Sequence, residues 1–288
     1  MGKDAEARAD EEALLRERMG RIERKIAVIS GKGGVGKSIV TANLAVALAW
    51  RGHPNAIGVL DADLHGPSIP KLLGMGGDLL EADPEGIRPA EGPLGIRVAS
   101  MAFLLPSEET PAVWRGPLKM KAIRQFLSDV IWGDLDYLLI DLPPGTGDEP
   151  LSVLQLIPDI DGVIVVTIPS EVSEAVVKKS ITFARMLKAP IIGLIENMSG
   201  LTCPHCGREI EVFSGNAGER IAEGLNVPLL GRIPLDPRIS EDSDRGIPFV
   251  VEHRDTPAGK AFMEIVDRIE GAMREAGRAS GPGPSPAP

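Results

Sequence analysis

The sequence contains only two cysteines, Cys203 and Cys206, and they stand three positions apart. Two cysteines so close together cannot form the disulfide framework of a small secreted protein, and a reducing compartment keeps both as thiols. The first residues carry charges in place of the apolar segment of a signal peptide, and no stretch approaches the roughly 18 apolar residues that span a bilayer. We therefore expect a cytoplasmic protein with no membrane partner.

Positive charge is also scarce, with 31 basic against 41 acidic residues and a net charge of −10. This balance opposes non-specific attraction to nucleic-acid phosphates or to an anionic membrane surface. No run of basic residues stands out locally. The charge pattern therefore predicts no nucleic acid among the partners.

Short apolar runs alternate along the chain with longer helical patterns. The runs are apolar on both faces, which is typical of strands in a parallel sheet covered by helices. They are Lys25 to Ser30, Ala56 to Leu60, Ile96 to Ser100, Tyr137 to Ile140, Gly162 to Ile168, Ile191 to Ile195 and Pro228 to Ile233. The pattern predicts an α/β fold with one doubly wound, mostly parallel sheet over residues 21–275.

Three segments do not fit this alternation. Residues 1–20 are charged and rich in Ala and Glu, which predicts an exposed helix or a frayed arm. Residues 276–288 are rich in Pro, Gly and Ser, which predicts a disordered tail. The Gly- and Pro-rich residues 74–95 predict an inserted loop or hairpin.

A phosphate-binding loop, Gly31-Lys32-Gly33-Gly34-Val35-Gly36-Lys37-Ser38, follows the first apolar run and precedes a helix expected over Ile39 to Trp50. Glycines let the backbone curl so that its N–H groups face phosphate oxygens, and the helix N-terminus adds partial positive charge. Lys37 is expected to neutralise β- and γ-phosphate charge, and the Ser38 hydroxyl to ligate Mg²⁺. The motif predicts nucleotide binding.

Three aspartates follow strands that should end near this loop. Asp141 comes after an apolar strand, as a Walker B aspartate does, and is expected to support the Mg²⁺ shell. Asp61 and Asp63 follow the second strand. Each alone is an ordinary turn or capping residue, but together they predict a metal-dependent phosphoryl-transfer site. Asn197 follows another strand, where its amide can pair with adenine or simply shape a turn.

Cys203 and Cys206 stand in a turn-rich segment, which we expect to form an insertion near residues 199–212 before a helix that begins near Gly215. The pair predicts a metal site for which one chain supplies too few ligands. Two thiolates hold one side of a tetrahedral metal or one edge of an iron–sulfur cluster, whereas a closed site needs four ligands. A homodimer with two such pairs at its two-fold axis supplies four cysteines. His205 is flanked too tightly to ligate with both, and His53, His65 and His253 are scattered. Structural zinc, a redox disulfide and an idle pair remain alternatives, because spacing does not separate iron from zinc.

Lys32 makes the loop similar to that of the deviant Walker A ATPases, whose signature is Lys-Gly-Gly-x-Gly-Lys. The resemblance implies a dimer in which Lys32 of one subunit reaches the phosphates held by the other, and stabilises transition-state charge as an arginine finger does. It further implies that Asp61 approaches the metal shell and Asp63 positions the attacking water. Asn197 stands where the family has an adenine-contacting Asn.

A longer resemblance covers residues 24–272. The segments that carry it are GKGGVGKS, DADLHGPSIPKLLG, WRGPLK (114–119), WGDLDYLLIDLPPGTGDE (132–149), ENMSGLTCPHCG (196–207) and IPLDPRI (233–239). Together they resemble the Mrp/ApbC family of iron–sulfur carrier ATPases. The resemblance implies a homodimer that holds a labile 4Fe–4S cluster between two pairs of Cys203 and Cys206. ATP binding and slow hydrolysis would then govern its transfer to apo iron–sulfur client proteins.

The chain departs from this family at residues 176–179, where Val-Val-Lys-Lys stands in place of the usual Asp-Val-Arg-Lys. Rival functions on the same core fit less well. A spatial organiser of the ParA or MinD kind needs a basic face or an amphipathic membrane helix. A reductase of the nitrogenase iron-protein kind takes its cysteines from separate segments. A nucleotide-switched binding module with structural zinc at the dimer seam remains the alternative.

Overall fold

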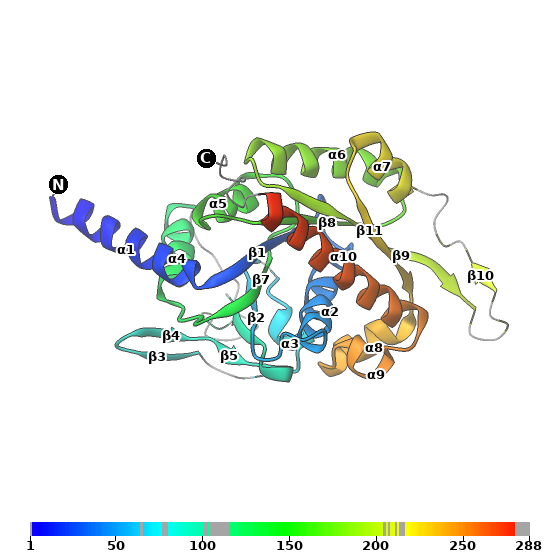
Figure 1. Ribbon diagram of the computed structural model, residues 1–288, viewed down its shortest axis with the longest axis horizontal. Helices are drawn as coiled ribbons and strands as arrows, with labels where there is room; N and C mark the ends of the chain where they lie inside the picture. The colour runs from blue at the N-terminus through cyan, green and yellow to red at the C-terminus, as the bar shows by residue number, and fades with distance from the viewer. Residues whose placement is uncertain are drawn as a thin grey trace, which may run out of the picture.

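The computed structural model describes residues 2–279, except for residues 64–65, 77–79, 101–102, 104–115, 204–205, 207, 211 and 213–216. Strands and helices alternate along most of the chain (Figure 1). The helices are α1 (Gly2–Gly20), α2 (Lys37–Trp50), α3 (Ile69–Leu72), α4 (Gly116–Asp129), α5 (Asp148–Leu156), α6 (Glu171–Met186), α7 (Ala217–Leu225), α8 (Pro237–Arg245), α9 (Phe249–His253) and α10 (Pro257–Ala279), with a 3₁₀ turn at Pro93–Gly95.

The main sheet has the strand order β10-β9-β8-β1-β7-β2-β6-β5, and β11 also pairs with β9. All pairs are parallel except the pair β9–β10 and the pair β5–β6. These strands are β1 (Ile22–Ile29), β2 (Ile57–Asp61), β5 (Ala90–Glu91), β6 (Arg97–Ser100), β7 (Leu135–Asp141), β8 (Gly162–Thr167), β9 (Ile191–Thr202), β10 (Glu209–Ile210) and β11 (Leu229–Leu235). The predicted α/β fold with a mostly parallel sheet is confirmed.

Helices cover both faces of this sheet, and strand β1 shows why. Successive side chains of a strand point to opposite faces. Ile26 and Val28 belong to a core that includes α2 and α10, whereas Ala27 and Ile29 belong to a second core that includes α4 and α7. The strand is therefore apolar at consecutive positions because each face of the sheet is buried.

Two structures extend from opposite sides of this body, helix α1 and the β9–β10 hairpin (Figure 1). The N-terminal helix is more than an exposed arm, because Leu15 and Met19 in its last turns are 4% and 1% exposed and pack in the core that includes Phe126 of α4. The segment expected as a turn-rich insertion from Ser199 onward instead continues β9 to Thr202. Pairing with β10 and β11 stabilises this extension.

The inserted segment at 74–95 does contain a hairpin, formed by β3 (Glu81–Asp83) and β4 (Gly86–Arg88). Helix α10 continues to Ala279, past residue 276 where the disordered tail was predicted to begin. The rest of the tail, His65, His205, residues 114–115 and the expected helix start near Gly215 lie outside the described residues. Among the helices that the structure describes, none has the length and apolar character required to cross a bilayer.

We predict that Met19→Ala destabilises the whole domain, because the side chain is 1% exposed and its truncation leaves a cavity between α1 and the body. The expected loss in the free energy of unfolding is about 2–4 kcal/mol, measured by urea denaturation. Glu17→Ala on the exposed face of α1 is the control and should change stability by less than about 0.5 kcal/mol. Equal effects of the two variants would mean that α1 is not part of the cooperative unit.

Candidate nucleotide and metal-thiolate sites

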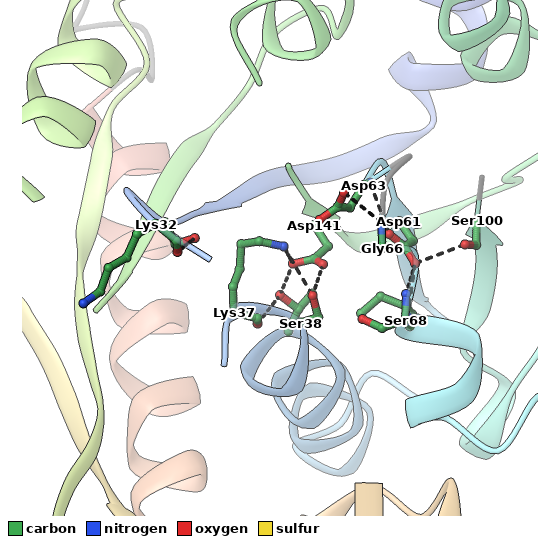
Figure 2. A network of polar contacts seen from close by, with 12 residues as sticks. Lys32, Lys37, Ser38, Asp61, Asp63, Gly66, Ser68, Ser100 and Asp141 are labelled. Atoms are coloured by element: carbon green, nitrogen blue, oxygen red, sulfur yellow. Dashed lines mark hydrogen bonds and ion pairs between the residues drawn. The ribbon is translucent and has the colours of Figure 1, made fainter. Parts of the chain in front are cut away.

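The three predicted aspartates meet because the sheet is parallel. Strand β7 lies between β1 and β2, and Asp61 is the register partner of Asp141 at the ends of β2 and β7. The phosphate-binding loop begins directly after the neighbouring β1. Carboxyl ends of parallel strands share one edge, so residues far apart in the sequence gather there. Figure 2 shows Asp61, Asp63 and Asp141 above the start of α2.

The loop has the backbone that its glycines allow. Gly34 and Gly36 have φ angles of 77° and 80°, in the left-handed region that side chains disfavour. Space is limited as well, since a β-carbon at Gly36 would collide with the side-chain amide of Asn197. A β-carbon at Gly31 would collide with Val176, the first residue of the family departure at 176–179. That departure therefore packs directly against the loop.

Lys37 and Asp141 form a buried ion pair, with Nζ 2.7 Å from Oδ1. Asp141 is completely buried, and its other oxygen accepts a hydrogen bond of 2.6 Å from the Ser38 hydroxyl. Thr41 donates a further bond of 2.9 Å to Oδ1. The Asp141 carboxylate at the end of β7 thus contacts three side chains of the first turns of α2, of which Lys37 and Ser38 are labelled in Figure 2. The C-terminal end of the loop is therefore anchored to the end of β7.

Asp61 is completely buried, and it accepts hydrogen bonds from the backbone N–H groups of Ser68 and Ile69 and from the Ser100 hydroxyl. Burial, and then repulsion by the Asp141 carboxylate, raise the pKa of Asp61 from 3.8 to about 7. In the described residues no lysine, arginine or histidine lies within ion-pair distance of Asp61. Among the described residues, Asp61 and Asp141 therefore have one ammonium near them, that of Lys37, which lies 2.7 Å from Asp141 Oδ1.

The donor set at this edge fits Mg²⁺. Ser38 offers a hydroxyl oxygen beside the carboxylate of Asp141, and the Asp61 carboxylate lacks a cation within ion-pair distance in the described part of the chain. Hard oxygen donors of this kind are the ligands that Mg²⁺ prefers. Asp63 is also buried beside them, and its Oδ1 accepts a bond of 3.3 Å from Gly66 N–H. Among the described residues, the site combines the backbone of the glycine-rich loop, the Lys37 ammonium and several carboxylate and hydroxyl oxygens.

Lys32 does not join this cluster. Its side chain points away from Lys37 and Asp141, on the other side of the loop (Figure 2). The Lys32 backbone carbonyl accepts a bond of 3.0 Å from the Ser30 hydroxyl, which orients the start of the loop. Within one chain, therefore, Lys37 alone of the two loop lysines faces the aspartates.

Asn197 contacts the loop directly. The side chain is 7% exposed, and its Nδ2 donates a hydrogen bond of 2.9 Å to the Val35 carbonyl. The amide is thus committed in part to the loop backbone, and its expected contact with adenine remains a prediction. The neighbouring Glu196 is 1% exposed and accepts a bond of 2.6 Å from Gly218 N–H at the start of α7.

Cys203 and Cys206 lie in the turn between β9 and β10, and neither forms a disulfide. The Cys203 N–H donates 2.8 Å to the Arg208 carbonyl and closes the turn. Cys206 is exposed and Cys203 partly so. The β9–β10 hairpin, which carries both residues in its turn, extends away from the body of the protein (Figure 1). The pair is open to solvent, as a site that shares ligands with another chain must be.

A cavity of about 520 Å³ opens beside this turn. It lies between the end of β9 and the segments that lead into α8 and α10, and its walls are mostly apolar. The lining residues are Leu201, Cys203, Pro234, Leu235, Asp236, Pro237, Arg238, Pro257 and Ala258. Cys203 is thus partly accessible to solvent in the hairpin turn and also lines a cavity on the body of the protein.

Sequence reasoning missed Thr41, Ser100 and Glu196. Thr41 lies one turn beyond Lys37 on α2, and that spacing was an available signal for a contact on the same helix face. Ser100 ends a predicted strand next to β2, so it shares the functional edge. Glu196 is a charged residue in an apolar strand, which signals a buried polar contact.

A protein-family model described as ParA, NUBPL iron-transfer P-loop NTPase, matches residues 21–270. The protein belongs to this family. Iron–sulfur cluster carrier proteins are close relatives. The one from Saccharolobus solfataricus is 54% identical over 88% of this chain and 84% of its own, and the one from Methanocaldococcus jannaschii is 55% identical over 91% and 89%. The recognition of an iron–sulfur carrier family from the motifs is confirmed.

Solved structures support the fold of the family. The nucleotide-binding protein of Archaeoglobus fulgidus in complex with ADP has a TM-score of 0.75 and 41% identity, over 87% of this chain and 96% of that chain. MinD of Aquifex aeolicus has a TM-score of 0.63 and 22% identity, over 86% and 97% of the two chains. The second likeness concerns the fold alone.

We predict that Asp61→Asn removes a pH dependence of stability in the nucleotide-free and metal-free protein. Because the pKa of Asp61 is about 7 in the folded state against 3.8 ordinarily, the folded state binds a proton that the unfolded state has released. Wild-type stability therefore falls as pH rises from about 4 to 7, by up to about 1.4 kcal/mol per pH unit for this group.

The measurement is urea unfolding of both proteins at pH 5, 6, 7 and 8. The stability of Asp61→Asn relative to wild type should rise between pH 5 and 7 and stay level at pH 8. Asp244→Asn, an exposed residue of α8, is the control and should follow wild type. A difference between wild type and Asp61→Asn that is the same at all four pH values would contradict the raised pKa.

Proposed function

We propose that this protein is an ATP-dependent carrier of iron–sulfur clusters. Two copies would hold a labile 4Fe–4S cluster as cargo between their Cys203 and Cys206 pairs and transfer it to apo-proteins in the cytoplasm. The names of the relatives support the carrier function, and the exposed thiols at the tip of a hairpin support shared ligation. Cluster transfer is an exchange of ligands, so a donor site that opens to solvent favours release.

The course of strand β9 is the observation that supports a link between nucleotide binding and cluster binding. Asn197 on this strand donates to the Val35 carbonyl inside the phosphate-binding loop. The same strand continues to Thr202 and leads directly into Cys203. A change in the loop on nucleotide binding would displace Asn197 and thereby the strand that carries the thiols. Nucleotide can shift the cysteine geometry only if it binds two geometries with unequal affinity.

The residues at the sheet edge would divide the ATPase reaction among them. The loop N–H groups and Lys37 would bind and orient the phosphates, and Ser38, Asp141 and Asp61 would hold Mg²⁺, which neutralises phosphate charge when bound. Asp63 would orient the attacking water. Lys32 would contribute in trans, because its side chain points away from its own site. The raised pKa of Asp61 would fall on Mg²⁺ binding, since a dication favours the carboxylate.

We predict that Cys203→Ala and Cys206→Ala each abolish cluster binding and leave nucleotide binding intact. The protein is reconstituted anaerobically with iron and sulfide, and iron, sulfide, zinc and solution mass are measured. Wild type should hold about two iron and two sulfide per chain in a dimer, because a four-iron cluster needs four thiolates. The matched control is Ser199→Ala on the same strand, which leaves both thiols in place.

Two other results would contradict the shared cluster. Cluster retained in both single-cysteine variants would place the ligands elsewhere. Zinc at about half an ion per chain without sulfide uptake would mean that one structural zinc ion joins two chains, since zinc accepts the same four thiolates. The protein would then be a nucleotide-switched binding module.

We predict that the two loop lysines separate binding from hydrolysis. Lys37→Ala should weaken ATP binding by at least about tenfold, because it removes the ammonium at the phosphates and leaves Asp141 buried without its cation. Lys32→Ala should bind ATP normally and lose at least about tenfold in turnover, because it acts on the transition state of the other subunit. Binding is measured by equilibrium titration and turnover by phosphate release.

Lys260→Ala, an exposed residue of α10, is the control for both assays. A mixture of Lys32→Ala and Lys37→Ala proteins tests action in trans. Mixed dimers contain one intact pair, formed by Lys37 of one chain and Lys32 of the other, so activity should partly return. No recovery despite exchange of subunits would mean that Lys32 acts within its own chain or not at all.

A further inference from the structure

Helices α8 and α9 bring together three potential metal ligands that belong neither to the nucleotide site nor to the cysteine pair. Asp242 lies on α8, and Glu252 and His253 end α9. One ligand atom from each lies within 4.8 Å of the other two. Gly246 and the following residues turn the chain between the two helices, so the cluster depends on this turn.

Asp242 has a buried oxygen that no hydrogen bond satisfies. The side chain is 3% exposed, and Oδ1 lies 3.3 Å from Arg245 Nη1. Its Oδ2 is buried and lies 3.2 Å from His253 Nε2, yet it takes part in no hydrogen bond. The distance is short enough for a hydrogen bond, but the orientation of the two groups is not suitable, because Nε2 and Oδ2 do not point at each other. Two atoms that converge on one zinc ion are about 3.3 Å apart in the same way.

We propose that Asp242, Glu252 and His253 bind one divalent transition-metal ion of the zinc class. One imidazole and two carboxylates form a donor set that zinc accepts readily, with water at the open position. Two carboxylates balance the charge of the dication, and the buried Asp242 Oδ2, which has no hydrogen bond, gains a partner. Glu252 is exposed, which leaves the ion able to enter from solvent.

The surroundings hold the ligands and give the ion a structural role. The His253 ring packs on Phe249 at 4.9 Å between ring centroids, which restricts its rotation. Val250 of α9 donates to Asn43 of α2, the helix that follows the phosphate-binding loop, at 3.0 Å. The first residues of α8 line the cavity beside Cys203. An ion bound to both α8 and α9 would therefore stabilise the packing of two helices that contact α2 and the cavity beside Cys203.

The test uses the full chain with Cys203→Ser and Cys206→Ser together, so that no thiolate competes for zinc. After removal of metals with a chelator, the protein is titrated with Zn²⁺ by calorimetry, with excess Mg²⁺ and ADP occupying the nucleotide site. We expect one zinc per chain and a higher temperature of unfolding, because the ion binds only the folded state. Glu252→Gln and His253→Gln should each weaken zinc binding by at least about tenfold.

Asp244→Asn, an exposed aspartate on the same helix, is the matched control and should leave zinc binding unchanged. Glu252 is exposed, so Glu252→Gln decides the matter even if His253→Gln folds poorly. The proposal is overturned if the cysteine-free protein takes up no zinc, or if zinc binds with the same affinity in Glu252→Gln. Neither result bears on the iron–sulfur proposal, because the cysteines are absent from every protein in the series.

Discussion

The buried ion pair between Lys37 and Asp141 is the interaction on which the rest of the site depends. A carboxylate removed from water costs several kcal/mol unless opposite charge and hydrogen bonds compensate it. Lys37, Ser38 and Thr41 supply that compensation, and all three come from the start of α2. The contact therefore fixes where α2 begins relative to β7. It also stabilises the curved conformation of the loop, in which the backbone N–H groups can face phosphate oxygens.

Asp61 shows what this arrangement leaves uncompensated. Its carboxyl group is buried beside Asp141 with hydrogen bonds but, among the described residues, no cation at ion-pair distance, and its pKa is accordingly raised to about 7. In the part of the chain that the structure describes, the Lys37 ammonium is therefore the cationic group close to these two carboxylates. A dication with bound phosphates is the natural complement, because the metal satisfies the carboxylates while the loop and Lys37 satisfy the phosphates. Nucleotide and metal are thus expected to bind together.

Strand β9 connects the phosphate-binding loop to the cysteine pair, and the proposed carrier function needs such a connection. Between β8 and β11 it is a paired strand of the sheet, where Asn197 bonds the phosphate-binding loop and Glu196 bonds the start of α7. Beyond β8 it extends into the hairpin whose turn holds both cysteines. The zinc-class site proposed at α8 and α9 includes Asp242 of α8, the helix whose first residues line the cavity beside Cys203, so a bound ion would stiffen one wall of that cavity.

Local apolar patterns in the sequence predicted seven of the nine strands of the main sheet, and the common edge of parallel strands predicted that Asp61 and Asp141 lie near the phosphate-binding loop. The sequence by itself did not determine that β9 continues through a segment rich in Asn, Ser and Gly, since pairing with β11, some distance along the chain, overrides weak local propensity there. Nor did it determine the burial of Leu15 and Met19, which depends on contact with α4. The direction of Lys32 and the convergence of Asp242 with His253 were likewise decided by tertiary structure alone, because side-chain direction and contacts between elements are set by packing and not by spacing in the sequence.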